Sequence, residues 1–182
     1  MSTASLLLKL FRHKAWADDE LLARVAQLDE ATQAAERHAA VRLLNHIHVV
    51  DRIFAAHLAG TSHGFTATNT SDTPTLPTLA AAMAETDRWY LAHIDGLDAQ
   101  ALAQVLRFTF TDGSAGAMSR EEMLAHVATH GGYHRGAVGR VLSQAGITPP
   151  RDLLTGHLHL TEPARRVGHS TMPMPSTSGL RR

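Results

Sequence analysis

The sequence contains no cysteine in 182 residues. Disulfides and a cysteine nucleophile are therefore excluded, and any bound metal must be held by histidine, carboxylate or water. Aromatic residues are also scarce, at 5% of the chain, so alanine, leucine and valine must build most of the core. Because 44% of the residues are hydrophobic, a single domain of this length can still bury a real core.

An excess of charge is missing as well. The 17 Lys and Arg residues balance the 17 Asp and Glu residues, and the sequence pI is near 7.3. Nucleic-acid-binding proteins usually carry a basic patch, and proteins on anionic membranes carry clusters of Lys and Arg. No apolar run approaches the roughly 18 residues that span a bilayer, and the apolar stretch near the N-terminus is too short for a secretory signal. We therefore expect a cytoplasmic protein that binds neither nucleic acid nor membrane.

Apolar residues recur at helical spacing in four segments. Ser119 and Glu122 form a capping-box pattern at the beginning of the last one. Four amphipathic helices predict an all-α fold, a four-helix bundle. The expected helices cover residues 4–28, 39–58, 79–95 and 120–145.

Two segments between these helices have a different character. Residues 61–78 are rich in Thr, Ser, Gly and Pro, which predicts a long loop between the second and third helices. Residues 105–110 alternate in polarity and precede an Asp-Gly pair, which predicts a short β-hairpin before the last helix. We expect both segments at the mouth of any pocket. The bundle should cover residues 1–163, and residues 164–182 are expected to form a disordered tail.

Histidine is abundant, with 13 in the chain, and His126, His130 and His134 follow one another at intervals of four residues. Imidazoles at this spacing project from the same side of a helix. At this frequency one such pair arises by chance about once per chain, and a run of three in roughly one chain in twenty. Spacing alone therefore does not establish a metal site, and the position of each histidine on its helix has to decide.

A helical wheel separates these histidines. At 100° per residue, His130 and His134 lie in the middle of the apolar stripe of the last helix, and His126 lies near its edge. On the second helix, His46 shares a face with apolar residues. Two unpaired imidazoles side by side in a core would cost several kcal/mol, and a metal ion removes that cost. These positions indicate a metal site between the second and last helices.

The remaining candidates are weaker. His57 also faces inward, but it lies ~16 Å along the helix from His46, too far to share one ion with it. A lone inward histidine such as His57 or His13 is usually a core residue with one satisfied hydrogen bond. The same wheels place four polar residues away from the apolar stripes, namely His48, Asp51, Arg52 and Arg135.

Three segments resemble the DinB-like family of metal-binding four-helix bundles. HVATHGGYHRGAV resembles its last-helix signature, LLNHIHVVDRIFAAHLAG its second-helix signature, and HKAWADDELL its first-helix pattern centred on Trp-Ala. The resemblance covers about residues 5–155. This chain differs from the pattern at Lys14 and Thr129, where Asn is frequent, and at Ala137, where Gln is frequent.

The resemblance implies that one histidine of the second helix and two of the last hold the metal. By matching position these are His46, His130 and His134, the same three that the helical wheels select. Zinc or nickel is the expected divalent ion, with iron or manganese as alternatives. A bundle without metal, in which the histidines are linked by hydrogen bonds, is a further alternative.

Three neutral imidazoles leave coordination positions open for water or substrate, as in catalytic sites. The leading hypothesis is a metal-dependent enzyme that transfers a low-molecular-weight thiol. The resemblance also implies a metal-dependent hydrolase or isomerase, and the rival reading is a non-enzymatic, stress-related metal-binding protein. We expect a homodimer. Candidate acid, base or supporting groups are His126, Tyr133 and Asp51, although Asp51 can equally pair with Arg52 in solvent and Tyr133 can simply pack.

Overall fold

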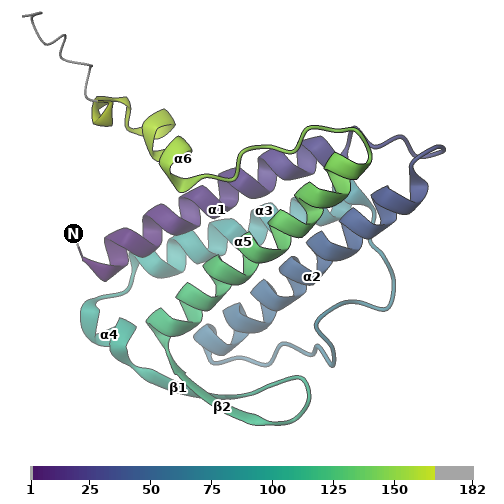
Figure 1. The fold of residues 1–182 in the computed structure, drawn as a ribbon. Helices are drawn as coiled ribbons and strands as arrows, with labels where there is room; N and C mark the ends of the chain where they lie inside the picture. Colours follow the sequence, from purple (N-terminus) through teal and green to yellow (C-terminus); the bar gives the residue numbers. More distant parts are fainter. Residues whose placement is uncertain (1, 167–182) are drawn as a thin grey trace, which may run out of the picture.

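The computed structural model describes residues 2–166. Its four long helices are α1 (Thr3–Val25), α2 (Ala34–Ala59), α3 (Leu76–Asp95) and α5 (Arg120–Gln144). Helix α1 packs against α3 and α5, and α2 packs against the same two helices, which closes the bundle (Figure 1). The predicted all-α four-helix bundle is confirmed. No helix in residues 2–166 combines the length and apolarity needed to cross a membrane.

The helix ends differ from the prediction by a few residues, for local reasons. The Asp29 carboxylate accepts hydrogen bonds from the backbone N–H groups of Ala31 and Thr32. This turn separates α1 from α2 and lets α2 begin five residues earlier than predicted, at Ala34. Because Thr75 caps α3 through its side chain and Pro77 occupies the first turn, α3 begins at Leu76.

The segment before α5 contains a short helix, α4 (Ala99–Ala103), and an antiparallel hairpin of β1 (Val105–Thr109) and β2 (Ala115–Ser119). The predicted hairpin and the capping box at the beginning of α5 are both confirmed. Phe108 pairs with Gly116 in the register. A Cβ at Gly116 would lie 2.7 Å from the Phe108 ring, so glycine is needed for the aromatic side chain to cross this strand.

The chain continues after α5 into α6 (Leu154–Thr161), which packs on α1, and a 3₁₀ turn η1 (Pro163–Arg165). His157 of α6 is buried. Of the predicted tail, residues 167–182 lie outside the described residues.

The core consists of two apolar clusters, one near each end of the bundle. One cluster includes Leu21, Leu44 and Leu142, and the other includes Phe11 and Tyr90. Buried charged side chains lie between the two apolar clusters along α1, α3 and α5, and beside these clusters on α2. These residues are Lys14, Asp18, Asp51, Asp87 and Arg135. We call these five residues the charged cluster.

Candidate metal centre

Three imidazoles converge where α2 and α5 face each other. His46 comes from α2, and His130 and His134 are one turn apart on α5. One ring nitrogen from each lies within 4.8 Å of the other two, and the ring centroids are 4.5 to 5.0 Å apart. The structure thus brings together the three residues predicted as metal ligands. We call them the histidine cluster.

The nitrogen positions suit a divalent ion. Two imidazole ligands of a tetrahedral zinc ion lie roughly 3.4 Å apart, given bonds of about 2.1 Å. The Nε2 atoms of His46 and His130 are 3.1 Å apart. His46 Nδ1 lies 2.7 Å from the carbonyl oxygen of Thr68, which can only accept, so Nδ1 carries the proton. In the tautomer with its proton on Nδ1, the Nε2 lone pair of His46 therefore faces the other two rings, as in metal sites whose ligands are oriented by a backbone carbonyl.

The environment favours the neutral form of His130 and His134, the two histidines of the cluster that lie on α5. Burial, followed by the nearby rings of His134, His46 and His126, lowers the pKa of His130 to about 4. Burial and His46 also lower the pKa of His134. Neutral imidazole is the form that coordinates metal. Within residues 2–166, the buried Nδ1 atom of His130 has no hydrogen-bond partner.

Without metal, one proton on His130 Nε2 can satisfy the contact with His46 Nε2, which is the hydrogen-bonded alternative named above. That arrangement leaves His134 outside the pair. A cation uses all three lone pairs at once, so the donor set fits a divalent ion better than it fits a single hydrogen bond.

The histidines are not in the centre of the buried face of α5, and this part of the prediction is wrong. The buried residues of α5 include Leu124, Val127, Arg135 and Leu142. At 100° per residue their face is turned by roughly 70° from the histidine stripe, toward Arg135. The three histidines are half-buried as a result. This position at the edge of the core leaves the cluster open to a cavity.

An apolar cavity of about 360 Å³ adjoins the cluster. Four histidines line part of its wall, namely His46, His57, His126 and His130. Thr68 comes from the loop between α2 and α3, and the hairpin contributes further residues, so the prediction that these segments line a pocket is confirmed. The main apolar lining consists of Val50, Ile53, Phe54, Phe108, Phe110 and Met118.

The candidate acid, base or supporting residues have separate positions. The ring of His126 lies 4.7 Å from Phe54 and 5.5 Å from His130, and burial lowers its pKa. Tyr133 is 78% exposed, with its ring 5.0 Å from that of His134. Both therefore stand beside the cluster, on different sides of it.

Asp51 is buried, and its predicted position on a solvated face with Arg52 is wrong. Its carboxylate lies 2.8 Å from Lys14 Nζ, which is also 2.8 Å from Asp18 and 2.7 Å from Asp87. Asp51 therefore belongs to the charged cluster inside the bundle and pairs with Lys14 there. The Lys14 ammonium donates hydrogen bonds to Asp18 and Asp87 and forms an ion pair with Asp51.

Arg135 extends the charged cluster toward the segment after α5. Its guanidinium lies 3.2 Å from Asp18 and 2.7 Å from Asp152, and Asp152 is also 3.0 Å from His13 Nε2. Arg135 is only 4% exposed. The prediction that it lies away from the apolar stripe is therefore wrong as well. His13, predicted as a core residue with one satisfied hydrogen bond, lies at the edge of the bundle beside Asp152.

Burial and pairing shift the pKa values of this cluster in opposite directions. Burial raises the pKa of Asp51 to about 7, against the lowering effect of Lys14. Burial alone would lower the pKa of Lys14, but its three carboxylates hold that pKa well above the usual value. His48, predicted on the solvated face, is also buried, and burial followed by Arg52 and Lys14 lowers its pKa to about 4.

A sequence signal for the charged cluster exists on α1. Lys14 continues the spacing of buried Leu7 and Phe11 toward Leu21, and Asp18 follows it by four residues. A lysine in an apolar stripe with an acidic partner one turn away indicates a buried ion pair.

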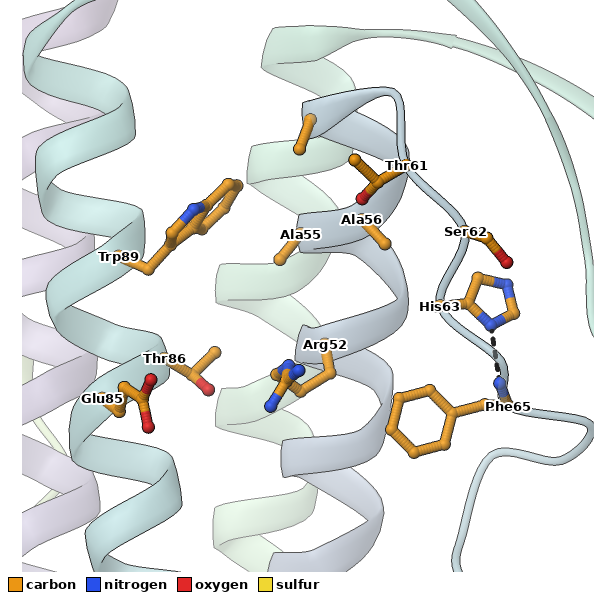
Figure 2. A pocket seen from close by; sticks show the side chains of 11 residues that line it. Arg52, Ala55, Ala56, Thr61, Ser62, His63, Phe65, Glu85, Thr86 and Trp89 are labelled. Atoms are coloured by element: carbon orange, nitrogen blue, oxygen red, sulfur yellow. Dashed lines mark hydrogen bonds between the residues drawn. The ribbon is translucent and has the colours of Figure 1, made fainter.

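A second, more polar cavity of about 260 Å³ lies along another face of α2 and shares no lining residue with the first (Figure 2). Arg52 extends from α2 toward Thr86 and Glu85 of α3, and His63 and Phe65 close the other side. Arg52 therefore lies beside this second cavity, away from both the histidine cluster and the charged cluster.

Comparisons with known proteins agree with this architecture. Neither the curated proteins nor the solved structures gave a match to the chain. The model of the DinB family matches residues 1–166, which include all four long helices and the three converging histidines. The chain therefore belongs to the DinB family.

Proposed function

We propose that this protein is a divalent-metal enzyme that transfers a small thiol to an electrophilic substrate, with His46, His130 and His134 as metal ligands. The observation that carries the proposal is the convergence of three imidazoles beside an apolar cavity. Zinc or nickel suits a set of imidazole ligands, with iron and manganese as alternatives.

The number of protein ligands supports a catalytic metal. Within residues 2–166, no fourth histidine, aspartate or glutamate joins the group. Structural zinc sites usually have four protein ligands, whereas catalytic sites have three and keep a position for water or substrate. A bound divalent ion would supply the charge that ionises a thiol or a water molecule at that position.

The chain's own residues would orient the reactants and move the proton. The carbonyl of Thr68 holds the His46 ring in place. His126, whose lowered pKa keeps it neutral at pH 7, is the candidate to accept the thiol proton. The sulfur then forms a bond to the electrophilic carbon, and the leaving group departs with the electron pair of the broken bond and takes the proton from His126.

Metal analysis of the purified protein tests the site. We expect about one bound ion per wild-type chain and almost none in His130→Ala or His134→Ala, because each change removes a ligand. His38→Ala is the matched control, since His38 is an exposed histidine of α2 and should leave the metal content unchanged. Equal metal content in the wild type and the two ligand variants would overturn the site.

A separate assay tests the reaction. Metal-loaded protein is incubated with small thiols and alkylating or acylating electrophiles, and adducts are measured by mass spectrometry. We expect His126→Ala to keep the metal and to lose about 10²-fold or more in rate, the usual contribution of an acid–base group. Metal-loaded wild type without activity on any pair would contradict thiol transfer, and ester or amide hydrolysis by the same preparation would identify water as the nucleophile.

A further inference from the structure

The apolar cavity adjoins the histidine cluster on one side only. His46 and His130 line it, whereas His134 does not. His134 lies instead beside the exposed ring of Tyr133. The proposed metal centre therefore has an apolar side and a solvent side, and two substrates can reach it from different directions.

Aromatic residues of the hairpin form one wall of this cavity. The rings of Phe108 and Phe110 are 4.8 Å apart, and Phe54 of α2 packs 6.1 Å from Phe108. Gly116 lets the two hairpin rings lie over its backbone, because a Cβ there would approach both to within 2.8 Å. The hairpin thus places the Phe108 ring against α2, with the Phe110 ring packed beside it.

Charge is missing from the lining. Among the described residues that line the cavity there is no Asp, Glu, Lys or Arg. Transfer of an unpaired charge into such a site is strongly unfavourable. Small cellular thiols carry ionised carboxylate or ammonium groups or many hydroxyl groups, so their polar parts do not suit this cavity. An uncharged apolar group does, and a volume of about 360 Å³ is within the range of small-molecule sites.

We propose that the cavity binds the electrophilic substrate, and that this substrate carries an uncharged aromatic or branched aliphatic group. The sulfur of the thiol then reaches the centre, where His126 can accept its proton, and the polar part of the thiol stays in solvent on the side of His134 and Tyr133. This inference rests on the proposed function, since it assigns the second substrate of the same centre. The aromatic wall of Phe54, Phe108 and Phe110 would stack on or enclose the apolar group.

The first test uses two matched probes on metal-free protein, followed by ¹⁹F NMR. 4-(Trifluoromethyl)benzyl alcohol is neutral, and 4-(trifluoromethyl)benzoate differs mainly in its charge. We expect saturable binding of the alcohol, at least 10-fold tighter than that of the benzoate. Met118→Glu should weaken binding of the alcohol at least 10-fold, while Met118→Leu should preserve it. Thr109→Glu is the control, because Thr109 is an exposed hairpin residue outside the cavity.

The second test asks whether the bound probe is near the metal. Protein loaded with paramagnetic Co²⁺ is compared with protein loaded with diamagnetic Zn²⁺. The ¹⁹F signal of the alcohol should shift and broaden with Co²⁺ in the wild type. His134→Ala should still bind the alcohol, since His134 does not line the cavity, but should show no effect of Co²⁺.

The outcomes separate this inference from the proposed function. Binding of the alcohol that is undetectable, unaffected by Met118→Glu, or no tighter than that of the benzoate overturns the inference while metal binding stands. Binding without any Co²⁺ effect in metal-loaded wild type also overturns it. If the wild type binds the alcohol but takes up neither metal, the proposed function fails, and the assignment of a substrate fails with it.

Discussion

Helices α2 and α5 each carry a residue of the histidine cluster and, five positions later, a residue of the charged cluster. On α2, Asp51 follows His46 by five positions, and on α5, Arg135 follows His130 by five. Five residues turn a helix by about 140°, so the second side chain faces a different neighbour from the first. The histidines meet at the edge of the core beside a cavity, and the charged residues point into the bundle interior.

The two clusters satisfy their polar atoms in different ways. Lys14 and Arg135 are paired with carboxylates at 2.7 to 3.2 Å, so both cations of the charged cluster have their partners within the protein, although the buried Asp51 Oδ1 accepts no hydrogen bond from residues 2–166. The histidine cluster is incomplete, since His130 Nδ1 has no partner within residues 2–166 and three lone pairs converge. A cluster whose cations are paired within the protein serves structure, and lone pairs that converge beside a cavity are available for a ligand.

The largest effect is expected from breaking the charged cluster. Lys14→Met removes the cation and leaves three buried carboxylates without it, which should lower the free energy of unfolding by about 3–5 kcal/mol. Lys9→Met is the control, because Lys9 forms a partly exposed pair with Glu162 and its loss should cost about 0–1 kcal/mol. Urea unfolding of metal-free protein measures both. Equal stability of the two variants would show that the charged cluster is not structural.

Loss of a residue from the histidine cluster should cost little stability in metal-free protein but should abolish the stabilisation by metal. His134→Ala in metal-free protein should unfold within about 1 kcal/mol of the wild type, since the residue is only half-buried. Metal at 100 times its dissociation constant should stabilise the wild type by about 2.7 kcal/mol and leave His134→Ala unchanged. Thermal unfolding with and without zinc measures this difference. Stabilisation of His134→Ala by zinc would place the metal elsewhere.

A smaller effect tests how closely α5 packs on the charged cluster. A Cβ at Gly131 would lie 3.1 Å from Arg135 Nη1 and 3.7 Å from Lys14 Cε, whereas Gly136 has nothing within 4 Å. Gly136→Ala should stabilise the helix by up to about 1 kcal/mol. Gly131→Ala should lack this stabilisation because the added methyl group displaces Arg135. We therefore expect it to be about 1–2 kcal/mol less stable than Gly136→Ala. Equal stability in urea would mean that Arg135 moves freely.

The sequence predicted the histidine cluster better than the charged cluster, for a physical reason. The histidines repeat at helical spacing, and their common side is readable at 100° per residue. Asp51 and Arg135 were assigned away from the core because charged residues are almost never buried unless paired, and a pairing across three or four helices leaves no local pattern. The four helices and the hairpin followed from periodicity, but the rotation of α5 depends on the packing of whole helices.

A pH-dependent effect separates the interior of the charged cluster from its rim. Asp51 has a folded-state pKa of about 7 against an ordinary value of 3.8, so the folded protein binds a proton that the unfolded chain lacks between these values. Its contribution to stability is present below pH 3.8 and is lost as the pH rises to 7. Asp152 has the opposite shift, because its partners His13 and Arg135 outweigh burial and lower its pKa to about 2.

The contribution of Asp152 is therefore present above pH 3.8 and is lost as the pH falls to 2. In the wild type, Asp51 should make the stability fall between pH 4 and 7, and Asp51→Asn should remove this fall. Asp152 should make the stability rise between pH 2 and 4, and Asp152→Asn should remove this rise. A full proton difference corresponds to about 1.4 kcal/mol per pH unit, which is the upper limit of each change in slope. Urea unfolding at half-unit intervals from pH 2 to 7 measures both slopes. If Asp51→Asn leaves the slope between pH 4 and 7 unchanged, the interior of the cluster takes up no proton on folding and is fully ionised around Lys14.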